Sequence, residues 1–189
     1  MMELSALPTR SKSGGFHVVV ESPRGSRAKI KYEPELRAFK FSRPLVMGLR
    51  YPYDWGFIPG TAAPDGDPLD AMVFSDVPTF PGVVIECRAL GVLRLKQNRK
   101  TAAGRERNDR LIAVPIKMPR FACFHKPSDL PLRWRQELEG FFLATTRFEG
   151  KDARILGWAS PSAGERMVDR FQSASKQSGA QEKSLFSSS

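Results

Sequence analysis

The stretch YPYDWGFIPGTAAPDGDPLDAMVF, residues 51–74, joins a loop rich in proline, glycine and aromatic residues to an acidic cluster and an apolar run. Aromatic side chains in such a loop favour a rigid loop packed on the body of a domain, where functional residues are often placed. The closing LDAMVF predicts a buried strand. Asp65, Asp67 and Asp70 crowd at the start of this strand. Their mutual repulsion costs free energy unless a cation lies among the carboxylates.

The spacing of these aspartates suits a divalent cation. In an extended chain Asp65 and Asp67 point to the same side, with backbone positions roughly 7 Å apart. Their carboxylates can therefore converge on one ion, or on two ions about 3.5–4 Å apart, and Asp70 can approach from the strand. Hard oxygen ligands favour Mg²⁺, with Mn²⁺ as a second candidate. A plain turn built from Asp, Gly and Pro is the alternative that needs no metal.

Several other segments have the composition or the alternation of β-strands. They are residues 16–21, 28–33, 37–42, 83–95, 110–116 and 152–158. Apolar residues at helical spacing predict a helix around 130–142, and residues 160–176 predict a short second one. Many short strands with few helices favour a fold that is mainly β with α, a small closed or partly closed β-barrel with helices packed outside.

The length of 189 residues suits one domain with its own core. We expect a flexible N-terminal segment at 1–14, the barrel domain at 15–172 and a Ser-rich disordered tail at 173–189. No apolar run reaches the ~18 residues of a membrane span, and the N-terminus lacks the apolar core of a secretory signal. Cys87 and Cys123 make no disulfide framework. These features predict a cytoplasmic protein without a membrane partner.

Half of the net charge of +10 is concentrated in one segment. Residues 94–110, RLKQNRKTAAGRERNDR, hold seven Lys or Arg against two acidic residues. Such a segment is typical of a solvated loop, and it can also attract nucleic acid, an anionic surface or a small anionic substrate. No aromatic residue interrupts it, so nucleic acid is not expected as a partner. Lys31, Glu33 and Arg43 add further charges that, with the acidic cluster, would bind metals and anionic oxygens as phosphoryl transfer requires.

The stretch 51–74 resembles the signature of the soluble family I inorganic pyrophosphatases, in which a Tyr-Pro run is followed by Asp-Gly-Asp-Pro-x-Asp. The flanking segments agree in order, and the resemblance covers residues 16 to 172 or thereabouts. It implies an OB-like, five-stranded closed β-barrel with two or so helices packed outside. It also implies Mg²⁺-dependent hydrolysis of inorganic pyrophosphate to two orthophosphates by a metal-activated water. A homo-oligomer, commonly a hexamer among bacterial relatives, is implied as well.

The same resemblance implies residue roles, position by position. Asp67 would be the general base for the attacking water. The implied metal ligands are all carboxylates, namely Asp65 and Asp70, with Glu21 and Glu33 supporting further ions directly or through water. The implied phosphate-binding side chains are Lys31 and Arg43. Trp55 stands where the family usually has a tyrosine, which keeps an aromatic wall but loses the hydroxyl.

The chain departs from the family pattern around its basic segment. An aspartate is usual soon after the GVL strand, where this chain has Gln97 and no carboxylate. If Arg110 takes the place of the family's lysine, the next expected aspartate falls on Asn108, one residue before Asp109. A one-residue slip in a strand turns a side chain to the other face, but a bulge would restore it. We therefore predict Asp109 as a metal ligand, with Asn108 as a neutral alternative.

A second departure lies near the end of the predicted helix, where Thr145 and Thr146 replace the family's Tyr-Lys phosphate-binding pair. Arg147 follows directly, and we predict it, with Arg110, to bind substrate. These changes keep two alternatives open. One is a non-catalytic relative that binds a polyanion through the basic 94–110 segment, and the other is a relative that acts on a larger phosphoanhydride. The retained acidic cluster weighs against the first.

Overall fold

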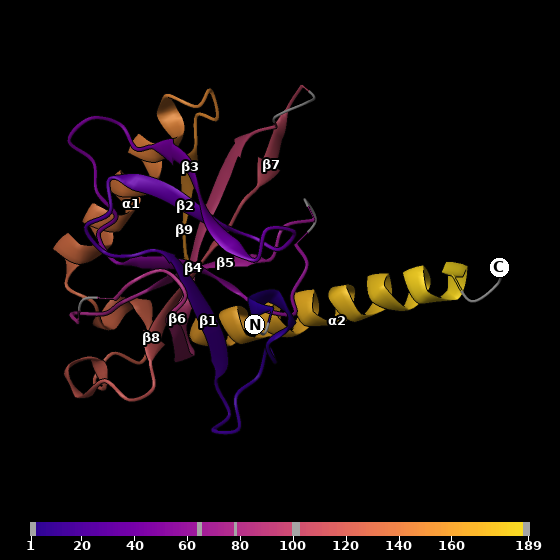
Figure 1. The fold of residues 1–189 in the computed structure, drawn as a ribbon. Coiled ribbons are helices and arrows are strands. Elements are labelled where there is room, and N and C mark those ends of the chain that lie inside the picture. Colours follow the sequence, from indigo (N-terminus) through magenta and orange to yellow (C-terminus); the bar gives the residue numbers. More distant parts are fainter. Residues whose placement is uncertain (1–2, 64–65, 78, 100–102, 187–189) are drawn as a thin grey trace.

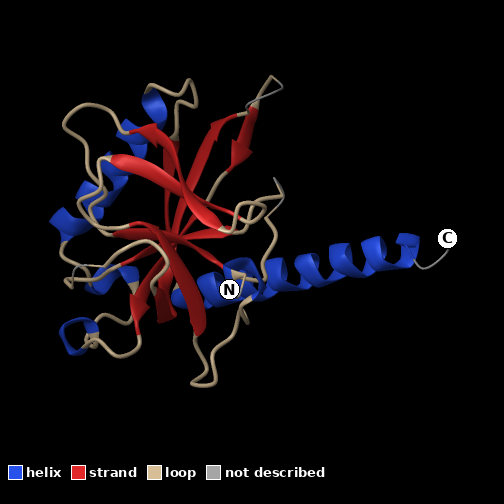
Figure 2. Ribbon diagram, viewed as in Figure 1, coloured by secondary structure: helices blue, strands red, loops and turns tan. Residues whose placement is uncertain are grey.

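The fold is known from a computed structural model that describes residues 3–63, 66–77, 79–99 and 103–186 (Figure 1). Within these ranges the chain forms nine strands and two α-helices (Figure 2). The strands are β1 (Phe16–Ser22), β2 (Ala28–Glu33), β3 (Ala38–Pro44), β4 (Asp54–Ile58), β5 (Leu69–Val73), β6 (Val84–Asn98), β7 (Arg105–Arg107), β8 (Arg110–Pro115) and β9 (Arg154–Ala159). The helices are α1 (Leu132–Arg147) and α2 (Pro161–Phe186), with short 3₁₀-helices η1 (Leu4–Ala6), η2 (Pro119–Phe121) and η3 (Pro127–Asp129).

Seven of the strands belong to one sheet with the order β1-β4-β5-β8-β6-β7, and β9 pairs with β6. Only the β5–β8 pairing in it is parallel. β1 also pairs with β6, so the pairings run in a circuit from β1 through β4, β5, β8 and β6 back to β1. β2 and β3 form a separate antiparallel pair, which crosses in front of the main sheet in Figure 1. The predicted architecture, mainly β with two helices, is confirmed.

Two apolar clusters fill the interior and fix the helices on the sheet. One contains Trp55 and Leu93 from the strands, Phe74 from the residue after β5, and Leu138 and Phe142 from α1. The other lies between the strands and the first turns of α2, where Val168 is fully buried. Burial of such side chains contributes about 1.5–3 kcal/mol each, so these contacts fix α1 beside the end of the sheet that carries the acidic cluster.

The β6–β8 pairing has a register shift between Ala89 and Gly91. A Cβ atom at Gly91 would lie 2.4 Å from Cγ of Pro127 and 2.7 Å from the carbonyl oxygen of Ala159. No side chain fits there, so glycine is required for η3 and β9 to pack against β6.

Two segments that we expected to be loops contain strands. Asp54–Ile58 is β4, and all five residues are buried. Trp55 and Phe57 lie two residues apart and so on the same face of the sheet. Trp55 packs into the cluster beside α1, and Phe57 into a third apolar cluster with Val19 and Tyr32. Parts of the basic segment also form strands, because β6 continues to Asn98 and pairs antiparallel with β7. Residues 96–98 and 105–107 are thus strand residues, which the solvated-loop interpretation of the basic segment did not include.

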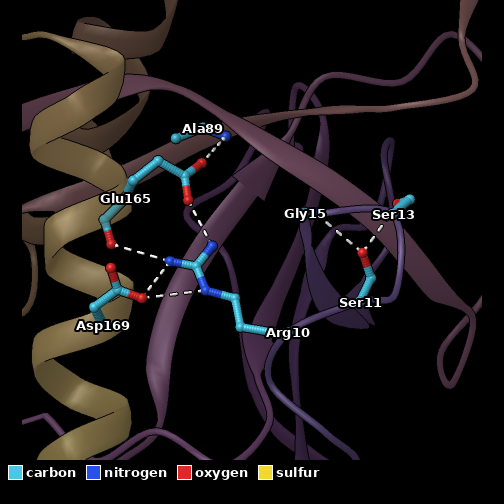
Figure 3. A network of polar contacts seen from close by, with 7 residues as sticks. All are labelled: Arg10, Ser11, Ser13, Gly15, Ala89, Glu165 and Asp169. Carbon is cyan, nitrogen blue, oxygen red and sulfur yellow. Dashed lines mark hydrogen bonds and ion pairs between the residues drawn. The ribbon is translucent and has the colours of Figure 1, made fainter.

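The chain before β1 contacts the beginning of α2 (Figure 3). Arg10 lies between two acidic residues of α2, with Nη1 2.6 Å from Oε2 of Glu165 and Nε 3.2 Å from Oδ1 of Asp169. The other oxygen of Glu165 accepts a hydrogen bond from the Ala89 N–H at 3.0 Å, which links α2 to β6. The division into segments 1–14, 15–172 and 173–189 stays a prediction. No helix in the described ranges is long and apolar enough to cross a membrane.

Candidate active site

The acidic cluster lies where β5 begins. Asp70 is the second residue of β5 and pairs in register with Phe57 of β4. Asp67 precedes the strand, and its Oδ2 accepts a hydrogen bond from Nζ of Lys31 at 3.0 Å. Burial disfavours the charged form of Lys31, but the hydrogen bond and the charge of Asp67 outweigh it and raise the pKa of this lysine. Asp65 lies outside the described residues.

Arg110, the first residue of β8, pairs with the acidic cluster. Its Nη1 lies 3.1 Å from Oδ2 of Asp70. The guanidinium is held on its other sides by aromatic rings, 5.4 Å from the ring centre of Trp55 and 5.9 Å from that of Phe142. The parallel pairing of β5 with β8 brings Asp70 and Arg110 together, because both lie at the starts of these neighbouring strands. Charge and stacking thus fix the orientation of Arg110.

Asp70 has a perturbed acidity. A third of its side chain is exposed, yet the surrounding protein still removes enough water to raise its pKa. The cations Arg110, Lys29 and Lys31 oppose this shift, and the charge of Asp67 adds to it. A further cation beside such a carboxylate would stabilise its charged form.

Glu21 and Glu33 occupy different environments. Glu21, in β1, is buried, and its Oε1 accepts a hydrogen bond from the Tyr32 N–H at 2.7 Å. Burial raises the pKa of Glu21 to about 7, although the Tyr32 hydrogen bond lowers it, and the charge of Asp70 also raises it. Glu33 is half-buried at the end of β2. Glu21 is therefore within electrostatic reach of the cluster from the opposite strand.

A cavity of about 500 Å³ opens beside the cluster, which we call the acidic cavity. Asp67, Asp70, Glu106, Asn108 and Asp109 line it, together with Arg107 and Arg110. Asp109 thus lies at the same cavity as Asp67 and Asp70. Its Oδ1 accepts hydrogen bonds from the Leu95 N–H at 3.1 Å and from Nε of Arg107 at 3.0 Å.

Arg110 also lines a smaller cavity of about 50 Å³, which we call the cationic pocket. It is lined by the basic side chains of Lys29, Arg43, Arg110 and Lys151 and by one carboxylate, Glu149. Trp55, Thr145 and Thr146 also line it. Arg147 is exposed and lines neither this pocket nor the acidic cavity.

The model of the family named "Inorganic pyrophosphatase" matches residues 18–176. The inorganic pyrophosphatase of Nostoc sp. is 38% identical over 175 residues, which cover 93% of this chain and 100% of that protein. The protein of the same name from Thermus thermophilus is 37% identical over 167 residues, covering 86% of this chain and 92% of the relative. The chain belongs to the inorganic pyrophosphatase family.

Solved structures agree with this membership. The crystal structure of the inorganic pyrophosphatase from Thermus thermophilus superposes with a TM-score of 0.84 at 34% identity, covering 93% of this chain and 99% of that one. The inorganic pyrophosphatase of Helicobacter pylori gives a TM-score of 0.81 at 27% identity, covering 90% and 98%. The resemblance noted in residues 51–74 is thus confirmed over most of the chain.

Several charged residues of this pyrophosphatase-family site were not singled out from the sequence. They are Lys29, Glu106, Glu149 and Lys151. Lys29 could have been noticed from the sequence, since it stands two residues before Lys31 in a segment predicted as a strand, and alternate residues of a regular strand share a face. Lys151 and Glu149 follow α1, and no local pattern shows that this connection folds back on Arg43.

The donor set fits a hard divalent cation. Carboxylates of Asp67, Asp70 and Asp109 and the amide of Asn108 surround the acidic cavity, and such oxygen ligands are those preferred by Mg²⁺ and Mn²⁺. In the described part of the chain, no three acidic, histidine or cysteine side chains already converge on one point. Asp67 and Asp109 instead contact Lys31 and Arg107.

Proposed function

We propose that this chain hydrolyses inorganic pyrophosphate to two orthophosphates with the help of a divalent cation, Mg²⁺ or alternatively Mn²⁺. The observation that carries the proposal is that the acidic cavity and the cationic pocket adjoin at Arg110, which lines both. A substrate with two linked phosphates needs cations on its oxygens and a positioned base for water. The names of the relatives support the same reaction.

The acidic side would hold the metal through Asp65, Asp70 and Asp109, with Glu21 and Glu33 as supporting carboxylates. When bound, the cation would neutralise phosphate charge and make water more acidic. The phosphates would be bound by Lys31, Arg43 and Arg110, with Trp55 as an aromatic wall. Arg147 lines neither cavity, so its role in binding substrate stays a prediction from the sequence. These assignments rest on the chemistry of the side chains and on their positions. Asp70 and Arg110, for example, already share a hydrogen bond.

Asp67 would take the proton from the attacking water. More than half of its side chain is exposed, so water and substrate can reach it. The Lys31 ammonium, 3.0 Å from its Oδ2, orients the carboxylate and lies ready to contact a phosphate oxygen. A base aligned in this manner contributes about 10²–10⁴-fold to a reaction rate.

Further features of the protein belong to the same proposal. The circuit of pairings through β1, β4, β5, β8 and β6 supports a five-stranded closed OB-like barrel. A homo-oligomer, and a hexamer in particular, and a cytoplasmic location are proposed from the family resemblance. The non-catalytic alternative is not favoured, because the named relatives are enzymes and Asp67 and Asp70 lie at one cavity.

The test is orthophosphate release from pyrophosphate by the purified full chain. We expect turnover with Mg²⁺ and none above background after chelation with EDTA, with activity returning when Mg²⁺ is added back. Tripolyphosphate and ATP, assayed in parallel, test the larger-substrate alternative. The proposal would be overturned if tripolyphosphate or ATP were hydrolysed faster than pyrophosphate, or if none of the three substrates released phosphate.

A further inference from the structure

The last turn of α1 brings no cation into the cationic pocket. Thr145 and Thr146 line it, but their hydroxyls donate hydrogen bonds back to the Phe142 carbonyl at 3.1 and 2.9 Å. Hydroxyls engaged with their own helix have little capacity left for a charged ligand. A phosphate in this pocket must therefore be bound by other side chains.

Lys151 reaches the pocket from the connection between α1 and β9. Its Nζ lies 2.5 Å from Oε2 of Glu149, and four fifths of the side-chain surface of both residues is buried. The other oxygen of Glu149 forms an ion pair with Arg43. One carboxylate thus holds an arginine and a lysine together at the pocket wall.

Lys29 approaches the same pocket from β2. Burial lowers its pKa, and the nearby charges of Lys31, Arg110 and Lys151 lower it further, while Asp70 raises it. Lys29 and Lys151 both line this small pocket. Like charges that line one small pocket repel each other, and an anion bound among them removes that cost.

The charge balance of the pocket points to the same ligand. Lys29, Arg43, Arg110 and Lys151 carry four positive charges, and Glu149 is the only carboxylate among the lining residues, all of which are described. The excess positive charge matches a phosphate group, whose several oxygens can accept hydrogen bonds from more than one cation.

We propose that Lys29 and Lys151 form a phosphate-binding subsite of this enzyme, which takes over from the Tyr-Lys pair that Thr145 and Thr146 replace. The inference rests on the proposed function, since it assigns the subsite to one phosphate of pyrophosphate. Glu149 is a positioning residue in this account: it keeps Arg43 and Lys151 aimed at the pocket when no phosphate is present.

The test uses the full chain with Lys29→Met and Lys151→Met, which keep the apolar stems and remove the charges. Lys151→Arg restores a cation, and Lys117→Met removes an exposed lysine beyond β8 as the matched control. We expect each methionine variant to raise KM for pyrophosphate about tenfold or more, with a smaller effect on kcat. Lys151→Arg should recover most of the loss, and Lys117→Met should match the wild type.

Calorimetric titration with inorganic phosphate gives a readout that does not depend on turnover. Both methionine variants should bind phosphate at least about tenfold more weakly than the wild type, at unchanged melting temperature. Unchanged KM and phosphate affinity in both variants would overturn the inference, as would a change confined to melting temperature and kcat. A wild type that binds phosphate without hydrolysing pyrophosphate would instead overturn the proposed function alone. If either variant fails to fold, the other and Lys151→Arg still decide the outcome.

Discussion

Arg110 donates a hydrogen bond from Nη1 to Oδ2 of Asp70 at 3.1 Å, while its guanidinium lies against the ring of Trp55. This pairing joins the acidic cavity to the cationic pocket, since Arg110 lines both. An arginine suits the position because its planar group can stack on aromatic rings and donate in a fixed direction at the same time.

The first prediction follows from this geometry. Lys keeps the charge but cannot stack as a plane, so Arg110→Lys should lower kcat/KM about tenfold and Arg110→Met about a hundredfold. Steady-state pyrophosphate hydrolysis measures both. Arg94→Lys, at an exposed position of β6, serves as the control. Equal activity of Arg110→Lys and the wild type would show that the stacking is not used.

Arg107 and Arg105 should differ although they lie two residues apart on β7. Arg107 lines the acidic cavity and pairs with Asp109, whereas Arg105 donates to the Asp152 carbonyl at 2.8 Å. We predict that Arg107→Ala raises KM for pyrophosphate several-fold, because a cation near the incoming anion is lost. Arg105→Ala should leave KM within about twofold of the wild type. Equal effects of the two substitutions would contradict this assignment.

Glu21 should make the free energy of unfolding of the metal-free protein depend on pH between about 4.5 and 7. Burial raises the pKa of Glu21 from 4.5 to about 7 in the folded state. A carboxyl group whose folded pKa is raised stabilises the fold while it is protonated, and that contribution is lost as the pH rises from about 4.5 through 7. Glu21→Gln keeps an acceptor for the Tyr32 N–H without this titration.

Urea unfolding in EDTA at pH 4.5 and pH 8 measures the effect. From pH 4.5 to pH 8, the free energy of unfolding of Glu21→Gln should rise by about 3 kcal/mol relative to that of the wild type. A difference between the two proteins that stays constant with pH would mean that Glu21 keeps its ordinary acidity when folded.

Arg10 should stabilise the contact between the N-terminal segment and α2. It donates to Glu165 and Asp169 from a partly buried position (Figure 3). Because this ion pair is partly exposed, we expect Arg10→Ala to lower the free energy of unfolding by only about 1 kcal/mol. The exposed Lys12→Ala is the control, and a loss as large in that variant would contradict a specific role for Arg10.

The sequence was most informative where local pattern and chemistry coincide. Asp67 and Asp70 stand in one short motif, and Arg110 starts a strand whose apolar run is easily recognised, so their shared cavity could be anticipated. Asp54–Ile58 was missed as a strand because its flanking Pro and Gly residues are typical of a loop, while burial of Trp55 and Phe57 decides the outcome.

The cationic pocket could not be anticipated in full, because tertiary packing assembles it. Lys29 and Lys151 are far apart in the chain and meet only when the α1–β9 connection packs beside β2. The same holds for Glu149, which pairs with Arg43 across the fold. Pairing of β7 with β6 likewise depends on a partner strand that the composition of 94–110 does not indicate.

The most direct test of the central claim is the turnover of Asp67→Asn, measured beside Asp76→Asn. The control removes an acidic side chain that pairs with Arg120 away from the acidic cavity. If Asp67 removes the proton from water, its amide variant should lose about 10²-fold or more in kcat. Asp76→Asn should keep wild-type turnover, and Mg²⁺ affinity should be measured for both variants. An Asp67→Asn enzyme that works within about threefold of the wild type, at saturating Mg²⁺ and pyrophosphate, would contradict the claim.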